Sequence, residues 1–155
     1  MTKPKWLTIQ QVDFIHEGAL KMGGGLQGTR DTGLLESALA RPQNLYAYGE
    51  KDTFVLAASY VEAILRNHPF ADGNKRTAFY TAVDFLEQNG HEVMPTKGKE
   101  HADMTLDLEQ EKITREDAAK HLRDHSRSLK KSVGKKDWTK KTTGIRRPRE
   151  IDRDR

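Results

Sequence analysis

Residues 67–80 constrain the fold of this chain more than any other stretch, because a short polar turn there separates two apolar runs. Pro69 disfavours the helical conformation for His68, so a helix that arrives from upstream should end at this point. Gly73 and Asn74 tolerate the positive φ angles of a sharp turn. A second helix is expected from about Asn74. The pattern therefore predicts two helices joined by a compact loop.

The runs on either side of this loop have the spacing of buried helix faces. From about Thr53, apolar residues recur every three or four positions with few polar interruptions, which predicts the central helix of the fold. After the loop, apolar residues from Phe79 to Leu86 repeat at the same spacing, and Asn89 with Gly90 supplies a stop. Two such helices packed together would hold the loop rigid, as a preorganised site requires.

Shorter helices are expected before this pair. Thr8 and Gln11 fit a capping box, so a helix should begin at Ile9 and stop at the glycine run 23–25. The apolar positions that follow Gly33 predict a short helix that ends before Pro42, because proline removes a backbone donor.

Beyond residue 90 the sequence predicts a brief extended piece at 91–94 and a helix over 100–109. Thr114 should cap a last helix that runs to about Arg127. His121 and His125 share one face of that helix. They are expected to be solvated rather than zinc ligands, because no third ligand is evident. Strands are nearly absent, so the predicted fold class is all-α.

The loop carries a candidate base and a candidate metal ligand. His68 has the one nearby side chain whose ordinary pKa suits removal of a proton near neutral pH. Asp72 is a hard oxygen ligand of the kind that Mg²⁺ uses beside a polyphosphate. Both residues lie within five positions of each other, so one turn of chain could present them to the same substrate.

The same loop also predicts an anion site. Backbone N–H groups from Gly73 to Lys75, with Asn74, would point outward at the start of a helix, where the helix dipole favours negative charge. Lys75 and Arg76 add two cations in the first turn, where that dipole disfavours them unless an anion is bound. A bound phosphate would resolve this conflict. Arg76 could donate to it through two N–H groups, and Lys75 would act as a point charge.

The segment His68–Arg76, with the sequence HPFADGNKR, resembles the signature of the Fic/Doc (Fido) family. Residues 28–43 are similar to the segment ahead of the catalytic loop in the death-on-curing toxins of that family, and the resemblance covers roughly residues 6–127. It implies a helical bundle with the catalytic loop between two central helices, a flap in the 28–43 region that holds a target peptide, and ATP with Mg²⁺ as cofactors. The catalytic residues it implies are His68, Asp72 and Arg76.

Two positions bear on which phosphorus is attacked. Members of the family that transfer AMP have glycine at the position of Lys75 and a second arginine at that of Phe79, whereas the death-on-curing toxin has lysine and an apolar residue. The resemblance thus favours a toxin that transfers the γ-phosphate of ATP to a Ser/Thr hydroxyl of elongation factor Tu and arrests translation. Two alternatives stay open: a protein adenylyltransferase, and a catalytically silent binding module whose basic tail engages nucleic acid.

The resemblance also implies a cognate antitoxin whose disordered segment folds over the site. The family's self-inhibitory pattern is only approximated at Thr32–Glu36, so inhibition by a partner chain is expected. Growth arrest on expression of the chain alone would be consistent with this.

Charge divides the chain into two regions. Residues 131–155 hold ten Lys/Arg and four Asp/Glu, so the remaining residues carry a net charge of −2 although the whole chain carries +4. We therefore predict a Fic/Doc domain over 1–128 and a basic, disordered tail over 129–155 that could contact RNA or the ribosome weakly. The chain has no cysteine, which excludes disulfides and thiol catalysis. It has neither an apolar run of membrane-spanning length nor a signal-peptide core, so a soluble, cytoplasmic protein is expected.

Overall fold

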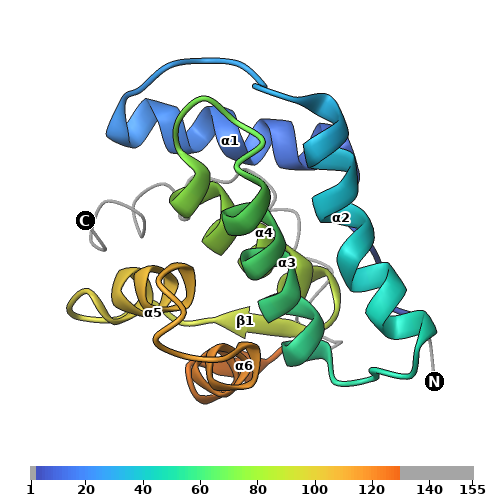
Figure 1. Ribbon diagram of the computed structural model, residues 1–155. Coiled ribbons are helices and arrows are strands. Elements are labelled where there is room, and N and C mark those ends of the chain that lie inside the picture. Colours follow the sequence, from blue (N-terminus) through green and yellow to red (C-terminus); the bar gives the residue numbers. More distant parts are fainter. Residues whose placement is uncertain (1–2, 130–155) are drawn as a thin grey trace.

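The computed structural model describes residues 3–129, which form helices and one small sheet (Figure 1). In chain order the elements are α1 (Ile9–Gly23), α2 (Thr32–Ala47), α3 (Thr53–Asn67), α4 (Asn74–Gln88), β1 (His91–Val93), α5 (Glu100–Glu109), α6 (Arg115–Asp124) and β2 (Ser126–Ser128). The expected helical fold is confirmed. Of the predicted basic tail, everything beyond Leu129 lies outside the described residues. Within the described part, no helix is long and apolar enough to cross a membrane.

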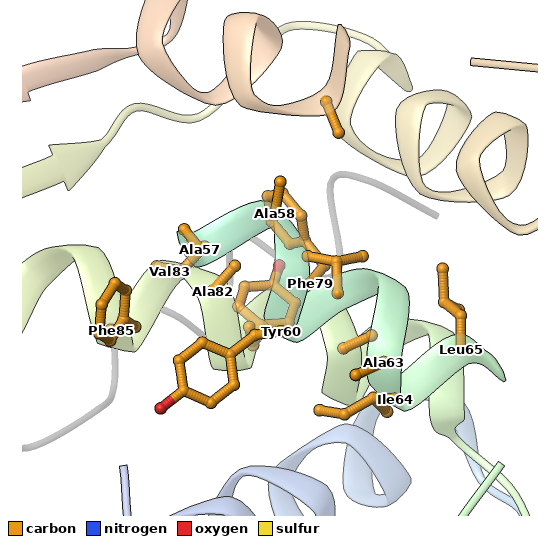
Figure 2. Packing of buried hydrophobic residues seen from close by; sticks show 14 of the residues in the cluster. Ala57, Ala58, Tyr60, Ala63, Ile64, Leu65, Phe79, Ala82, Val83 and Phe85 are labelled. Atoms are coloured by element: carbon orange, nitrogen blue, oxygen red, sulfur yellow. The ribbon is translucent and has the colours of Figure 1, made fainter. Parts of the chain in front are cut away.

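Helix α3 is the central element of the core, as its sequence predicts. Every residue from Val55 to Leu65 is buried, so this helix has neighbours on all sides. It packs along α4 and also contacts α2, α5 and α6. Figure 2 shows the interface with α4, where small side chains such as Ala57 and Ala82 lie between larger ones such as Tyr60 and Phe85. Because α3 and α4 are packed side by side, the loop that joins them is held at one end of the pair.

Local signals place the ends of these helices. Thr8 and Gln11 form the expected capping box at the start of α1. Helix α3 ends at Asn67, and the next residue, His68, adopts a left-handed conformation with φ 48° and ψ 57°. Gly73, with φ 81°, is the N-cap of α4. The helix end at His68 and the positive φ at Gly73 are as expected from the proline and the glycine, whereas the left-handed conformation of His68 was not predicted.

The prediction that a helix ends before Pro42 is wrong, because α2 continues to Ala47 with the proline inside it. Proline at this position cannot donate to the carbonyl of Ala38. Its ring is nevertheless buried on the same face as Leu35 and Leu39, the buried face of a helix that packs against α3. Burial of that continuous apolar face outweighs the loss of one hydrogen bond.

The last predicted helix is shorter than expected. Helix α6 ends at Asp124 instead of about Arg127, and residues 126–128 form β2, which pairs antiparallel with β1. The pairing sets Val93 opposite Ser126, and the main-chain N–H of Met94 donates to the carbonyl of His125 at 2.7 Å. The extended piece predicted at 91–94 acquires a partner strand from 35 residues further along the chain, which local periodicity does not predict.

The segment before α1 is attached to the far end of α4. The Asn89 side chain accepts from the N–H of Lys5 at 2.8 Å and donates to the Lys5 carbonyl at 3.1 Å. It also donates to the carbonyl of Phe85 at 2.7 Å. One amide therefore closes the C-terminus of α4 and secures the N-terminal segment at the end opposite the 68–73 loop.

Candidate functional site

The imidazole of His68 has neighbours at both ring nitrogens. Asn74 Nδ2 lies 3.0 Å from Nδ1, and the carboxylate of Glu109 lies 3.8 Å from Nε2. Because an amide nitrogen can only donate, Nδ1 accepts, and the proton of the neutral ring is on Nε2. The side chain is 55% exposed, so a substrate hydroxyl can approach it.

Asn74 fixes the shape of the loop from the first residue of α4. Its Oδ1 accepts from the N–H of Phe70 at 3.1 Å, and its Nδ2 donates to the carbonyl of Phe70 at 2.9 Å as well as to His68. These two main-chain partners settle which way the amide points. The side chain is thus occupied within the loop, and the group that Asn74 can offer to a phosphate is its main-chain N–H.

Phe70 and His16 support the loop from beneath. Phe70 is buried, and its ring stacks on that of His16 with centroids 3.9 Å apart and an interplanar angle of 10°. His16 Nε2 donates to the carbonyl of Asp72 at 2.7 Å. Helix α1 therefore lies against the loop, as Figure 1 also shows. Phe70 therefore points inward and helps to hold the loop in place.

Asp72 presents one carboxylate oxygen to solvent. Its Oδ2 accepts from the N–H of Leu26 at 2.8 Å, which aims the group without neutralising it. The described residues hold no group of three or more His, Asp or Glu side chains able to bind a metal ion. A single carboxylate suits Mg²⁺, which takes most of its remaining ligands from water and substrate phosphates. The residues present thus fit a nucleotide-bound Mg²⁺ with Asp72 as the protein ligand.

Two cations follow at the start of α4. The main-chain N–H groups of its first residues have no intrahelical acceptor and open towards the loop. Lys75 Nζ lies 3.7 Å from the carboxylate of Glu109. Arg76 reaches in the other direction, to the C-terminal end of α1, where a Cβ atom on Gly23 would lie 1.4 Å from its guanidinium Nη1. The structure thus places both cations beside the loop, each against a different neighbouring helix.

These groups surround one cavity of about 470 Å³. Its lining residues come from the loop, from α4 and from the start of α5: His68, Ala71, Asp72, Gly73, Asn74, Lys75, Arg76, Phe79, Tyr80, Lys99, His101, Ala102 and Thr105. All six residues predicted for the site therefore border the same space. Phe79 supplies an apolar wall, because it is buried and packs on the ring of His101.

His101, which also borders the cavity, belongs to a histidine cluster with His121 and His125. His121 Nε2 lies 2.9 Å from His101 Nδ1, and the rings of His121 and His125 stack with centroids 4.1 Å apart. Burial, followed by the neighbouring His125 and His101, lowers the pKa of His121 to about 4. The expectation that His121 and His125 are solvated surface residues is therefore wrong: both pack against a buried histidine of another helix.

Three residues near the loop were not predicted from the sequence. Arg30 donates to main-chain carbonyls at the end of α3, Glu109 faces His68 and Lys75, and Lys99 borders the cavity. Arg30 lies in the segment similar to the death-on-curing toxins, so that similarity was a usable signal. Glu109 and Lys99 have none, because only the packing of α5 brings them to the loop.

Comparison with known proteins gives consistent results. A family model described as the Fic/DOC family matches residues 6–86, which include the whole loop. The chain is 38% identical over 98 residues to "Protein kinase doc" of Escherichia phage P1, a match that spans 63% of this chain and 76% of that protein. It is 41% identical over 85 residues to "Toxin Doc" of Mycolicibacterium smegmatis (strain ATCC 700084 / mc(2)155), which spans 53% of this chain and 64% of that protein.

Proposed function

This chain belongs to the Fic/DOC family, and from that premise we propose that it is a Doc-like toxin of a toxin–antitoxin pair that acts in the cytoplasm. It is a protein kinase that transfers the γ-phosphate of ATP to a Ser or Thr hydroxyl of a translation factor, elongation factor Tu being the first candidate. Modification of that factor arrests translation.

One observation carries the proposal: a base, a carboxylate and the open N-terminus of a helix border a single cavity. Phosphoryl transfer to a hydroxyl requires removal of a proton, neutralisation of phosphate charge and alignment of the two reactants. His68, Asp72 and the first turn of α4 supply one group for each requirement. The cavity, at about 470 Å³, is of the size that takes a small-molecule ligand.

In the proposed reaction, His68 accepts the proton of the substrate hydroxyl. The hydroxyl oxygen forms a bond to the γ-phosphorus, and the bond from that phosphorus to the bridging oxygen breaks, releasing ADP. In the resting structure the proton of the neutral ring is on Nε2, because Asn74 donates to Nδ1. Accepting a proton at Nε2 therefore requires the ring proton to be on Nδ1 instead. Substrate binding has to be accompanied by a rearrangement of this one hydrogen bond.

Two groups of residues would neutralise the negative charge of the phosphates. The N–H groups at the start of α4, with Lys75 and Arg76, supply donors and positive charge on one side of the cavity. The exposed oxygen of Asp72 would hold Mg²⁺, which when bound neutralises part of the polyphosphate charge. Lys99 also borders the cavity and adds a further cation there.

Two side chains in the cavity support transfer of the γ-phosphate over transfer of AMP. Lys75 occupies space at the helix start that glycine would leave open, and it is directed towards Glu109. Phe79 is buried and offers no donor at the position where AMP-transferring relatives would place an arginine. A nucleotide pose that needs both the open space and the arginine is disfavoured here.

The partner in this proposal is a cognate antitoxin, a segment of which folds over the loop and excludes substrate. The exposure of His68 and of Asp72 supports such a lid, since a covering chain can reach both. Expression of this chain alone should arrest growth, and co-expression of the antitoxin should restore it.

The decisive experiment incubates the full chain with Mg²⁺, elongation factor Tu and ATP labelled at either the γ- or the α-phosphorus. We expect label only from γ-labelled ATP, on a Ser or Thr identified by mass spectrometry. His68→Ala should abolish labelling. His91→Gln is the matched control, because that ring packs on Phe54 and does not border the cavity.

The other outcomes each select another function. Label from α-labelled ATP would replace the kinase by an adenylyltransferase. Absence of label from both, combined with RNA binding that weakens with salt, would replace the enzyme by a binding module.

A further inference from the structure

We propose that Arg30 is the positioning residue for His68: its guanidinium and its main-chain N–H hold the carbonyls of three consecutive residues where α3 gives way to the catalytic loop. The expected effect on kcat rests on the proposed transfer reaction. The expected effect on the shape of the loop does not.

His68 needs such support because its backbone is strained. A φ of 48° is uncommon for a residue with a side chain, and a proline follows it directly. A residue stays in this region only when its surroundings hold it there. The imidazole itself contributes one hydrogen bond, to Asn74, which the reaction has to rearrange. The restraint must therefore come from the main chain.

The carbonyls around His68 show where that restraint originates. Arg30 Nη2 donates to the carbonyl of Asn67 at 3.0 Å, and Arg30 Nε donates to that of His68 at 2.8 Å. The N–H of Arg30 donates to the carbonyl of Pro69 at 2.7 Å, helped by the N–H of Asp31 at 3.1 Å. The carbonyls of three successive residues thus all accept hydrogen bonds from Arg30, and the third also accepts one from Asp31.

Arginine suits this task better than lysine. The last carbonyls of a helix lack intrahelical donors and carry partial negative charge, so a cation near them is favoured. The planar guanidinium holds two donors at a fixed spacing, which sets the angle between two peptide groups. A lysine amine would supply the charge without that geometry.

Arg30 acts on the loop from outside the cavity. It is absent from the lining residues, and its neighbours Gly28 and Thr29 are joined to Ala71 and Phe70 by main-chain contacts. Loss of its side chain should therefore displace the histidine without removing a group that binds ATP. That predicts a fall in kcat with an unchanged KM for ATP.

The test compares Arg30→Ala, Arg30→Lys and the control Arg127→Ala, an exposed arginine of β2 that pairs with Glu92 and does not border the cavity. With elongation factor Tu as substrate, we expect Arg30→Ala to lower kcat by about ten- to a hundredfold and to leave KM for ATP within about twofold. Arg30→Lys should recover only part of the loss. Added guanidinium should restore activity to Arg30→Ala and not to His68→Ala.

Three results would overturn the inference: full activity of Arg30→Lys, a kcat of Arg30→Ala within about twofold of the unchanged chain, or a loss explained by the unfolded fraction in a melting curve. A second readout does not depend on activity. In the full chain with ¹⁵N-labelled histidine, the His68 ring resonances should move in Arg30→Ala and stay in Arg127→Ala. If the unchanged chain labels no target, the proposed function is wrong. If the His68 resonances do not move in Arg30→Ala, the positioning role is wrong, whatever the result for the proposed function.

Discussion

Arg76 lies where it does because Gly23 has no side chain. A Cβ atom there would lie 1.4 Å from the guanidinium, whereas one at Gly18, on the same helix, would meet nothing within 4 Å. Because the clash involves the flexible end of a side chain, Gly23→Ala should fold normally but shift the guanidinium. We expect KM for ATP to rise about two- to tenfold, in line with loss of one charged hydrogen bond.

Gly18→Ala is the internal control for that prediction. Alanine in a helix interior is favoured over glycine by about 0.5–1 kcal/mol, so this variant should unfold at higher denaturant concentration and keep the KM of the unchanged chain. An unchanged KM in Gly23→Ala would mean that Arg76 does not touch the nucleotide.

Glu109 puts a negative charge where phosphate is expected to bind. It lies 3.8 Å from His68 Nε2 and 3.7 Å from Lys75 Nζ, and its side chain is 26% exposed. A like charge at such distances near a surface costs a bound anion roughly 1 kcal/mol. Glu109→Gln should therefore tighten ATP binding about fivefold by calorimetry, and less at high salt. Glu116→Gln, on the exposed side of α6, should leave the affinity unchanged; equal effects of the two variants would argue against a local charge effect.

For single residues, the sequence predicted those site residues that are close together in the chain. It did not predict those that only the fold brings to the loop. His68, Asp72 and Asn74 could be assigned because they lie within one turn. Arg30 is 38 positions from His68, and Glu109 reaches the loop only through the packing of α5. The side chain of Asn74 binds other groups of the loop instead of pointing towards an anion. That role could not be predicted, because it depends on the left-handed turn around Asn74.

Among the elements, the join between α5 and α6 should make the fold sensitive to acid. The pKa of His121 is lowered to about 4, mainly by burial and then by His125 and His101, against the opposing effect of Asp124 and Glu100. Its ordinary value is 6.5, so between these values the unfolded chain binds a proton that the folded chain does not. The free energy of unfolding should therefore fall as the pH drops from about 6.5 to about 4, by about 1–2 kcal/mol, since solvent screens part of the effect.

Urea unfolding measured across that pH range would test this. His121→Gln keeps a donor for His101 without a titrating group, so its stability should depend less on pH over the interval. Parallel pH profiles for the two proteins would show that another group controls the acid response.

The elements also show why some boundaries could be predicted and others could not. Capping boxes at Thr8 and Thr114 act over three residues, and both helix starts match the prediction. The continuation of α2 through Pro42 depends on its burial against α3. Strand β2 exists because β1 offers it an edge. Both outcomes are tertiary effects that override a local preference.

For the whole molecule, the uneven charge predicts two separable activities. The residues that line the cavity belong to the part of the chain that the structure describes, and the ten Lys/Arg of 131–155 lie beyond that part. A chain that ends at Lys130 should keep kcat and KM for ATP within about twofold and lose any RNA binding that weakens as salt rises. Filter binding at several salt concentrations, with labelling kinetics in parallel, would measure both. Lost labelling in the shortened chain would contradict the predicted boundary between the 1–128 domain and the 129–155 tail.

The attachment of the N-terminal segment to Asn89 has a practical use. Only the main chain of Lys5 takes part in it, and the side chain is exposed. Because the chain contains no cysteine, Lys5→Cys would carry a single fluorophore, about 22 Å from the 68–73 loop along a fifteen-residue helix. Energy transfer from that dye to a labelled nucleotide or partner would report occupancy of the loop without obstructing it.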